Sequence, residues 1–170
     1  GNTESWATNV IMSQGEAGIR IGGDSEFGVS AESTTFIRGN SIDSNGGLGI
    51  DQLFRTGVFN GPGVTANDLA DQVQDYPLLN NVVAGLTTRI VGQIEGIPNQ
   101  SIVVDFYASP SPDPSGNGEG SRFLGTANLT TNLSGLATFD ASFAAATIRG
   151  EAITAIATTD AGGSSEFSAA

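Results

Sequence analysis

The chain has 170 residues, of which only 14% are charged, and 18 acidic residues against 6 basic ones give a formal net charge of -12. All six basic residues are arginine, and lysine, histidine and cysteine are absent. These absences exclude Ser-His-Asp and Cys-His nucleophile pairs, zinc sites of nitrogen and sulfur ligands, and lysine chemistry. Nucleic acid is an unfavourable partner because the negative chain repels a phosphate backbone.

The same composition predicts where the protein works. An acidic surface stays soluble through self-repulsion, and the lack of cysteine is compatible with a secreted bacterial protein. No apolar run approaches the roughly 20 residues that span a bilayer. The chain opens at Gly1 instead of Met, so we interpret it as a mature product or a fragment. We therefore expect an extracellular or cell-surface protein without a membrane span.

An internal repeat lies near the start of the chain. Residues 9–20 align without gaps on residues 40–51, with identity at 6 of 12 positions. Apolar residues alternate within each copy and a glycine-containing turn separates the runs, a pattern that predicts β-solenoid coils. Asn9 and Asn40 would then occupy equivalent corners and stack their side-chain amides. Two unrelated hairpins with similar glycine-rich turns are the alternative.

The remainder of the chain divides into a linker and a region of alternating strands. Turn formers predict a linker at residues 57–75, between coils at 1–56 and a third region at 76–170. In that third region apolar residues alternate with polar ones in about seven runs, which predicts two sheets packed face to face. The residues expected to face inward are Ile90, Gly92, Ile94, Ile102, Val104, Phe106, Ala108, Phe123, Gly125, Ala127, Leu129, Ala137, Phe139, Ala141, Phe143, Ile153, Ala155 and Ala157.

A family resemblance accompanies these patterns. The run at 38–51, RGNSIDSNGGLGID, resembles the last coil of bacterial right-handed parallel β-helix repeat proteins. The stretches at 67–79 and 105–168 are similar to the linker and the C-terminal module of that family. The resemblance implies an all-β chain, with a short right-handed parallel β-helix segment followed by a seven-stranded immunoglobulin-like β-sandwich. It also implies a secreted or cell-surface protein.

Two acidic stretches are candidate calcium sites, because Ca²⁺ takes six to eight oxygen ligands. The first lies in the linker and the second in the long loop before residue 121; neither has EF-hand spacing. Their members are Asn67, Asp68, Asp71 and Asp75, and Asp113, Asn117 and Glu119. Such residues also form Asx-turns and cap loops, and that is the alternative. No other cofactor is expected.

Catalysis is the other function that the resemblance raises, because parallel β-helices include pectate-lyase-like enzymes. Arg38, Asp43 and Asp51 lie near one predicted coil, but two coils cannot supply a long substrate groove. Arg20 and Asp51 occupy equivalent repeat positions and are more simply a surface ion pair worth ~0–1 kcal/mol. Carbohydrate stays possible as a ligand, although one Trp and two Tyr are too few for a stacking platform. The C-terminal part of a polysaccharide-active, lyase-like enzyme is the second hypothesis.

The first hypothesis is a non-enzymatic structural module. About three stacked coils are needed to bury a solenoid interior, and only two are recognisable. Ile11, Ile19, Ile42 and Ile50 are therefore expected to face an uncovered end. Upstream coils, a cap from residues 1–8, or strand addition by another subunit would complete it. We thus expect an adhesin stalk, a self-assembling filament or a surface-layer subunit.

Overall fold

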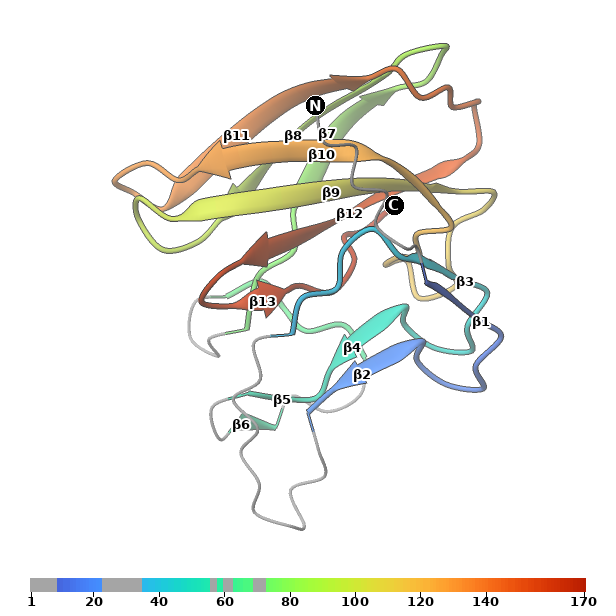
Figure 1. Cartoon of the computed structure of the whole chain (residues 1–170), viewed down its shortest axis with the longest axis horizontal. Helices are drawn as coiled ribbons and strands as arrows, with labels where there is room; N and C mark the ends of the chain where they lie inside the picture. The colour runs from blue at the N-terminus through green and yellow to red at the C-terminus, as the bar shows by residue number, and fades with distance from the viewer. Residues whose placement is uncertain (1–8, 23–34, 56–57, 60–62, 69–72) are drawn as a thin grey trace.

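The computed structural model describes residues 9–22, 35–55, 58–59, 63–68 and 73–170 (Figure 1). Within these ranges the regular structure consists of strands, which confirms the predicted all-β class. The suggested cap at residues 1–8 and the candidate ligand Asp71 lie outside the described residues.

The internal repeat forms parallel strand pairs. Strand β1 (Val10–Met12) pairs with β3 (Ser41–Asp43), and β2 (Ile19–Ile21) pairs with β4 (Ile50–Gln52). Each residue lies opposite the one 31 positions later, so the gapless alignment gave the right register. We call residues 9–21 coil 1 and residues 38–53 coil 2.

The corners of the two coils match as well. The Asn9 side-chain amide donates to Asn40 Oδ1 at 3.0 Å, so the predicted amide ladder is present. Ser13 and Ser44 hold equivalent positive φ angles of 59° and 58°. A Cβ on Gly46 would lie 2.5 Å from the Gly15 carbonyl oxygen, so only glycine permits the coils to approach this closely. The repeated glycines and serines are therefore explained by turn geometry.

Two antiparallel sheets follow the coils, and a short hairpin of β5 (Phe54–Arg55) and β6 (Val58–Phe59) precedes them. One sheet has the order β10-β9-β12-β13 and the other the order β11-β8-β7. Their bounds are β7 Leu78–Val83, β8 Thr88–Glu95, β9 Ser101–Ser109, β10 Arg122–Thr130, β11 Leu136–Phe143, β12 Ala152–Thr159 and β13 Gly163–Ser164. The sheets share one apolar cluster in which Phe106 packs edge-on against Phe139, with ring centroids 5.3 Å apart.

The residues predicted to face inward are correct along four of the strands and wrong at the start of β10. The inward residues predicted on β8, β9, β11 and β12 lie in or against the shared cluster, apart from Gly92, which is buried under Phe139. In β10 the register shifts between Phe123 and Gly125, so Leu124 enters the core instead. Phe123 is 45% exposed and packs on Tyr107, on the other face of the sheet. A bulge of this kind reverses the side-chain alternation and leaves no mark in the hydrophobic pattern.

A second apolar cluster lies on the outer face of β9 and β12. Its buried members are Ile37, Ile42, Ile50, Tyr107, Ile156 and Phe167, with Ile11, Ile19 and Ile21 packed against them. The molecule therefore has three layers, namely the β11-β8-β7 sheet, the β10-β9-β12-β13 sheet and the coils (Figure 1).

This second cluster corrects one expectation about the coils. Ile42 and Ile50 do not face an open end, because each is only 1% exposed beneath side chains of the middle sheet and the C-terminal segment. Ile11 and Ile19, in coil 1, are half-buried. Apolar contacts thus join the coils to the sheets, which lie on opposite sides of the predicted linker at residues 57–75 in the sequence.

Candidate functional site

Coil 2 is fixed to the middle sheet by an ion pair. Arg38 donates from Nε and Nη2 to the two Asp105 carboxylate oxygens, at 2.7 and 2.9 Å. Thr126 donates a third bond of 2.6 Å to Asp105, whose side chain is 1% exposed. The bond to Asp105 raises the pKa of Arg38. Arg38, a catalytic candidate from the sequence, is thus held in a structural contact.

Glu119 closes the free edge of coil 2. The Asn45 backbone amide and side-chain amide both donate to its carboxylate, the latter at 2.6 Å. Beside it, Ile42 and Gly120 exchange two backbone hydrogen bonds of 2.9 and 2.8 Å. Glu119 is 4% exposed, and burial raises the pKa of its carboxyl by more than the Asn45 bonds lower it.

Glu166 performs the same role at the other end of coil 2. It accepts bonds from the Gln52 amide at 2.9 Å and from the Thr65 amide at 2.8 Å. Glu166 is 2% exposed, and burial raises the pKa of its carboxyl. No described arginine forms an ion pair with Glu119 or Glu166, so backbone amides, the Asn45 side-chain amide and the Thr65 hydroxyl compensate these buried carboxylates.

These buried carboxyls predict that mild acid stabilises the fold. Burial also raises the pKa of Asp51, in addition to those of Glu119 and Glu166. A carboxyl whose pKa is higher in the folded state contributes stability below its unfolded pKa of about 4, and loses it as the pH rises. The free energy of unfolding is therefore expected to be larger at about pH 5 than at about pH 7.

The carboxyls of the exposed Asp140 and the half-buried Glu151 act in the opposite sense at lower pH. The Arg89 bond lowers the pKa of Asp140, and the Ile148 backbone amide, followed by an arginine bond, lowers that of Glu151. Their stabilising contribution is lost only as the pH falls below about 4. The free energy of unfolding should therefore pass through a maximum in mild acid, and urea unfolding at a series of pH values checks this. Glu166→Gln should reduce the increase in the free energy of unfolding between neutral pH and this maximum. A steady loss of stability from neutral pH downward would contradict it.

The calcium candidates are occupied by contacts within the chain. Asn67 bridges the linker through a 2.7 Å bond to the Tyr76 carbonyl and a 3.0 Å bond from the Tyr76 amide. Asp113 accepts from the Ser115 amide in an Asx-turn, and Asn117 donates to the Phe167 carbonyl. Asp68 is exposed and Asp75 is buried, and both have interactions.

We expect EDTA to leave the melting temperature unchanged, because these contacts match the alternative role of turn formation. In the described ranges, no three acidic side chains lie close enough together to hold a metal ion. A melting curve with and without added Ca²⁺ checks this expectation. A rise in the melting temperature with Ca²⁺ that EDTA reverses would establish the site predicted from the sequence.

Coil 1 presents an open edge. Strands β1 and β2 each belong to a two-stranded sheet whose other member comes from coil 2. Val10 is 65% exposed and Met12 48% exposed on the outer side of β1. The sequence predicts a surface ion pair between Arg20 and Asp51. In the structure Arg20 Nε lies 3.7 Å from the Asp51 carboxylate, but the Asp51 side chain is only 4% exposed. Within the described part of the chain coil 1 has no second neighbouring strand, so its outer edge is unpaired there.

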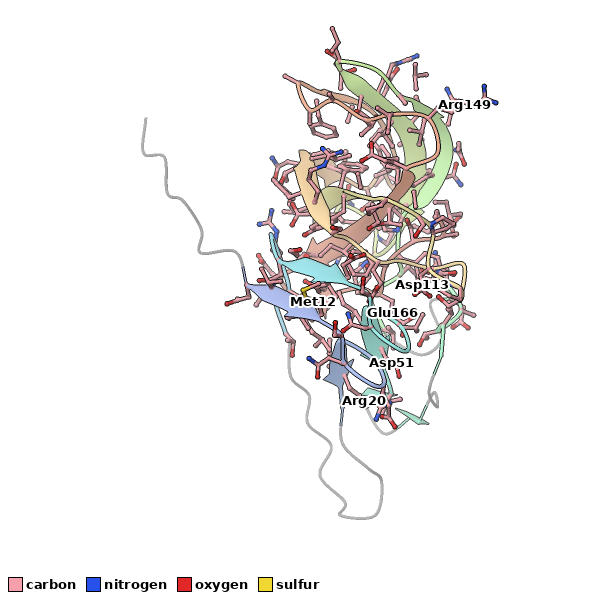
Figure 2. The ribbon with its side chains drawn as sticks, turned by 90° about the vertical axis from the view of Figure 1, so that its right-hand side faces the viewer. Met12, Arg20, Asp51, Asp113, Arg149 and Glu166 are labelled. Atoms are coloured by element: carbon pink, nitrogen blue, oxygen red, sulfur yellow. The ribbon has the colours of Figure 1, made fainter. Side chains whose placement is uncertain are left out.

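A groove lies between the opposite outer layer and the middle sheet. It separates the edge strand β7 from residues 147–153 and has a volume of about 660 Å³. Val82, Val83 and Ile148 line it with exposed apolar side chains. Arg149 lies at the same groove and forms no ion pair with any described residue. Figure 2 shows Arg149 at the far end of the molecule from Met12 and Arg20.

Sequence analysis did not identify this groove. The adjacent Val82 and Val83 break the inside-outside alternation, and that was the available signal. Two adjacent apolar residues of a strand cannot both face the core, so one must be exposed or contact another element.

Comparison with known proteins gives no relative. No family model matches the chain, and no curated protein matches it. The described residues contain no helix that is long and apolar enough to cross a membrane.

Proposed function

We propose that this chain is a structural and assembly module of an extracellular protein, and that it associates through the open edge of coil 1. The observation that carries the proposal is the pairing of β1 and β2 on one side only, with Val10 and Met12 exposed. An edge strand of this kind offers backbone groups to any strand that adds to it.

The proposal includes a finer description of the architecture. The parallel, 31-residue register of β1–β3 and β2–β4 supports two coils of a right-handed parallel β-helix. The two facing antiparallel sheets, made of β7–β13, support an immunoglobulin-like sandwich. Coil 2 is fixed to the sandwich by Arg38, Glu119 and Glu166, so force applied to coil 1 reaches the whole molecule.

A role without catalysis is supported by how the candidate groups are used. Arg38 is bound to Asp105, and Asp51 accepts from the Gly63 amide and lies beside Arg20. The acidic, cysteine-free composition supports an extracellular or cell-surface location.

Sedimentation velocity over a wide range of protein concentrations tests the proposal. We expect the chain to form oligomers whose size grows with concentration, and the double variant Val10→Lys/Met12→Lys to remain monomeric. Ile97→Lys/Leu133→Lys is the matched control, because it adds the same two charges at exposed positions away from coil 1. A chain that is monomeric at every concentration, or an edge variant that associates like the control, would overturn the proposal.

A further inference from the structure

The open edge of coil 1 needs a complementary surface on its partner, and the structure presents one. The groove beside β7 combines an edge strand with apolar walls, and it lies between the middle sheet and the outer layer opposite the coils. We propose that β1 of one copy of this chain docks into the β7 groove of a second copy. This inference rests on the proposed function and names the partner surface.

The first argument is the match between two edge strands. In the described residues β7 pairs only with β8, and β1 pairs only with β3, so each has one unpaired backbone edge. Three residues of β1 span about 10 Å, and the six residues of β7 about 20 Å, so β1 fits along the groove. Backbone bonds between the two edges would join the sheets of neighbouring copies.

The second argument is the apolar surface that both edges expose. Val10 and Met12 are separated by one residue and therefore point to the same side of β1. Val83 and Ile148, at 49% and 73% exposed, offer an apolar surface of the same kind in the groove. Docking would remove these four side chains from water, and that is the main favourable contribution to association.

The third argument is charge. Copies with a net charge of -12 repel one another, so a stable contact requires a local cation on one side. Arg149 provides it at the groove, where it forms no ion pair with a described residue. Asp43 lies directly opposite Met12 in the parallel pair, and its carboxylate would face Arg149 across the contact.

The proposed contact can repeat from one copy of the chain to the next. The edge lies in one outer layer and the groove beside the other, so docking leaves a free edge on one copy and a free groove on the other. Such a head-to-tail contact forms open chains unless the rotation between copies closes a ring. A three-residue strand contact is also small, so we expect weak association that strengthens as salt screens the net repulsion.

Mixing two variants tests the inference by sedimentation velocity. Val10→Lys/Met12→Lys destroys the edge and keeps the groove, and Val83→Lys/Ile148→Lys destroys the groove and keeps the edge. We expect each variant alone to be monomeric, and an equal mixture to form one-to-one dimers that grow no further. Unchanged circular dichroism spectra and melting temperatures establish that both variants are folded.

The other outcomes separate this inference from the proposed function. If the groove variant still oligomerises while the edge variant does not, the edge pairs with another surface, such as a second edge, and the groove inference falls alone. If wild type is monomeric throughout, both fall, and the edge belongs to a different partner such as an upstream coil. If both variants oligomerise like wild type, both proposals fall as well.

A charge exchange tests the proposed ion pair. Arg149→Asp should weaken association about tenfold, and adding Asp43→Arg on the same chain should restore it. Because Asp43→Arg also returns the net charge to its original value, Asp160→Arg on the Arg149→Asp chain is the control, since Asp160 is exposed elsewhere. A recovery with Asp43→Arg that the control does not reproduce requires the two positions to meet between copies, because Asp43 lies on β3 and Arg149 at the β7 groove. Failure of Asp43→Arg to improve the Arg149→Asp chain would contradict this orientation of β1 in the groove.

Discussion

Replacing Phe167 by alanine is expected to lower the free energy of unfolding by about 3–5 kcal/mol, the usual cost of removing a fully buried phenylalanine. The Phe167 side chain is central to the second apolar cluster and is 2% exposed. Its ring packs edge-on against Tyr107 with centroids 5.5 Å apart, and it fills the space above Gly49 and Gly120. The change therefore removes the central apolar contact between coil 2 and the middle sheet.

Urea unfolding followed by circular dichroism measures this loss. Leu133→Ala is the control, because Leu133 is 84% exposed and should change stability by less than about 0.5 kcal/mol. Hydrogen exchange should also accelerate at the amides of coil 2 more than at those of β8. An equal acceleration in both regions would mean that the coils and the sheets unfold only together.

Replacing Arg38 by methionine is expected to cost about 2–4 kcal/mol, because it leaves the buried Asp105 side chain with Thr126 as its remaining side-chain partner. The expected cost is below that of a fully buried pair, since the Arg38 side chain is 41% exposed. Arg89 and Asp140 form a comparable two-bond pair at the surface, with side chains 51% and 54% exposed. Arg89→Met should therefore lower the free energy of unfolding much less than Arg38→Met does.

The double variant Arg38→Met/Asp105→Leu separates the charge effect from the loss of packing. If the uncompensated carboxylate causes the loss, removing it as well should recover most of the stability of Arg38→Met. A double variant as unstable as Arg38→Met would show that the arginine acts through other contacts. Chemical denaturation of wild type, Arg38→Met, Asp105→Leu and the double variant gives the coupling energy directly.

Local patterns predicted local geometry correctly. The identities between residues 9–20 and 40–51 fixed the register of both parallel pairs, and Asn9 and Asn40 stack as expected. Alternation also assigned the inner faces of β8, β9, β11 and β12. Each of these features depends on neighbours along the chain or on an in-register repeat, and the sequence displays both.

The packing of the coils on the sheet could not be predicted in this way. Arg38 and Asp105 are 67 positions apart, and nothing in the sequence pairs them. One signal was available, because Tyr107 and Ile156 lie on the faces of β9 and β12 opposite the predicted core. Apolar residues on both faces of a strand indicate a sheet that is covered on both sides. The expectation of an open end is therefore wrong for Ile42 and Ile50, whereas Ile11 and Ile19, in coil 1, are half-buried against the same cluster.

Hydrogen–deuterium exchange at β1, measured as a function of protein concentration, tests the open edge most directly. The amides of Val10–Met12 that point away from β3 should exchange rapidly in dilute solution. They should become protected as the concentration rises, while the amides of β9, inside the molecule, stay protected throughout. Protection at β1 that is the same at every concentration would mean that the edge is already closed, or never used, and would contradict assembly through coil 1.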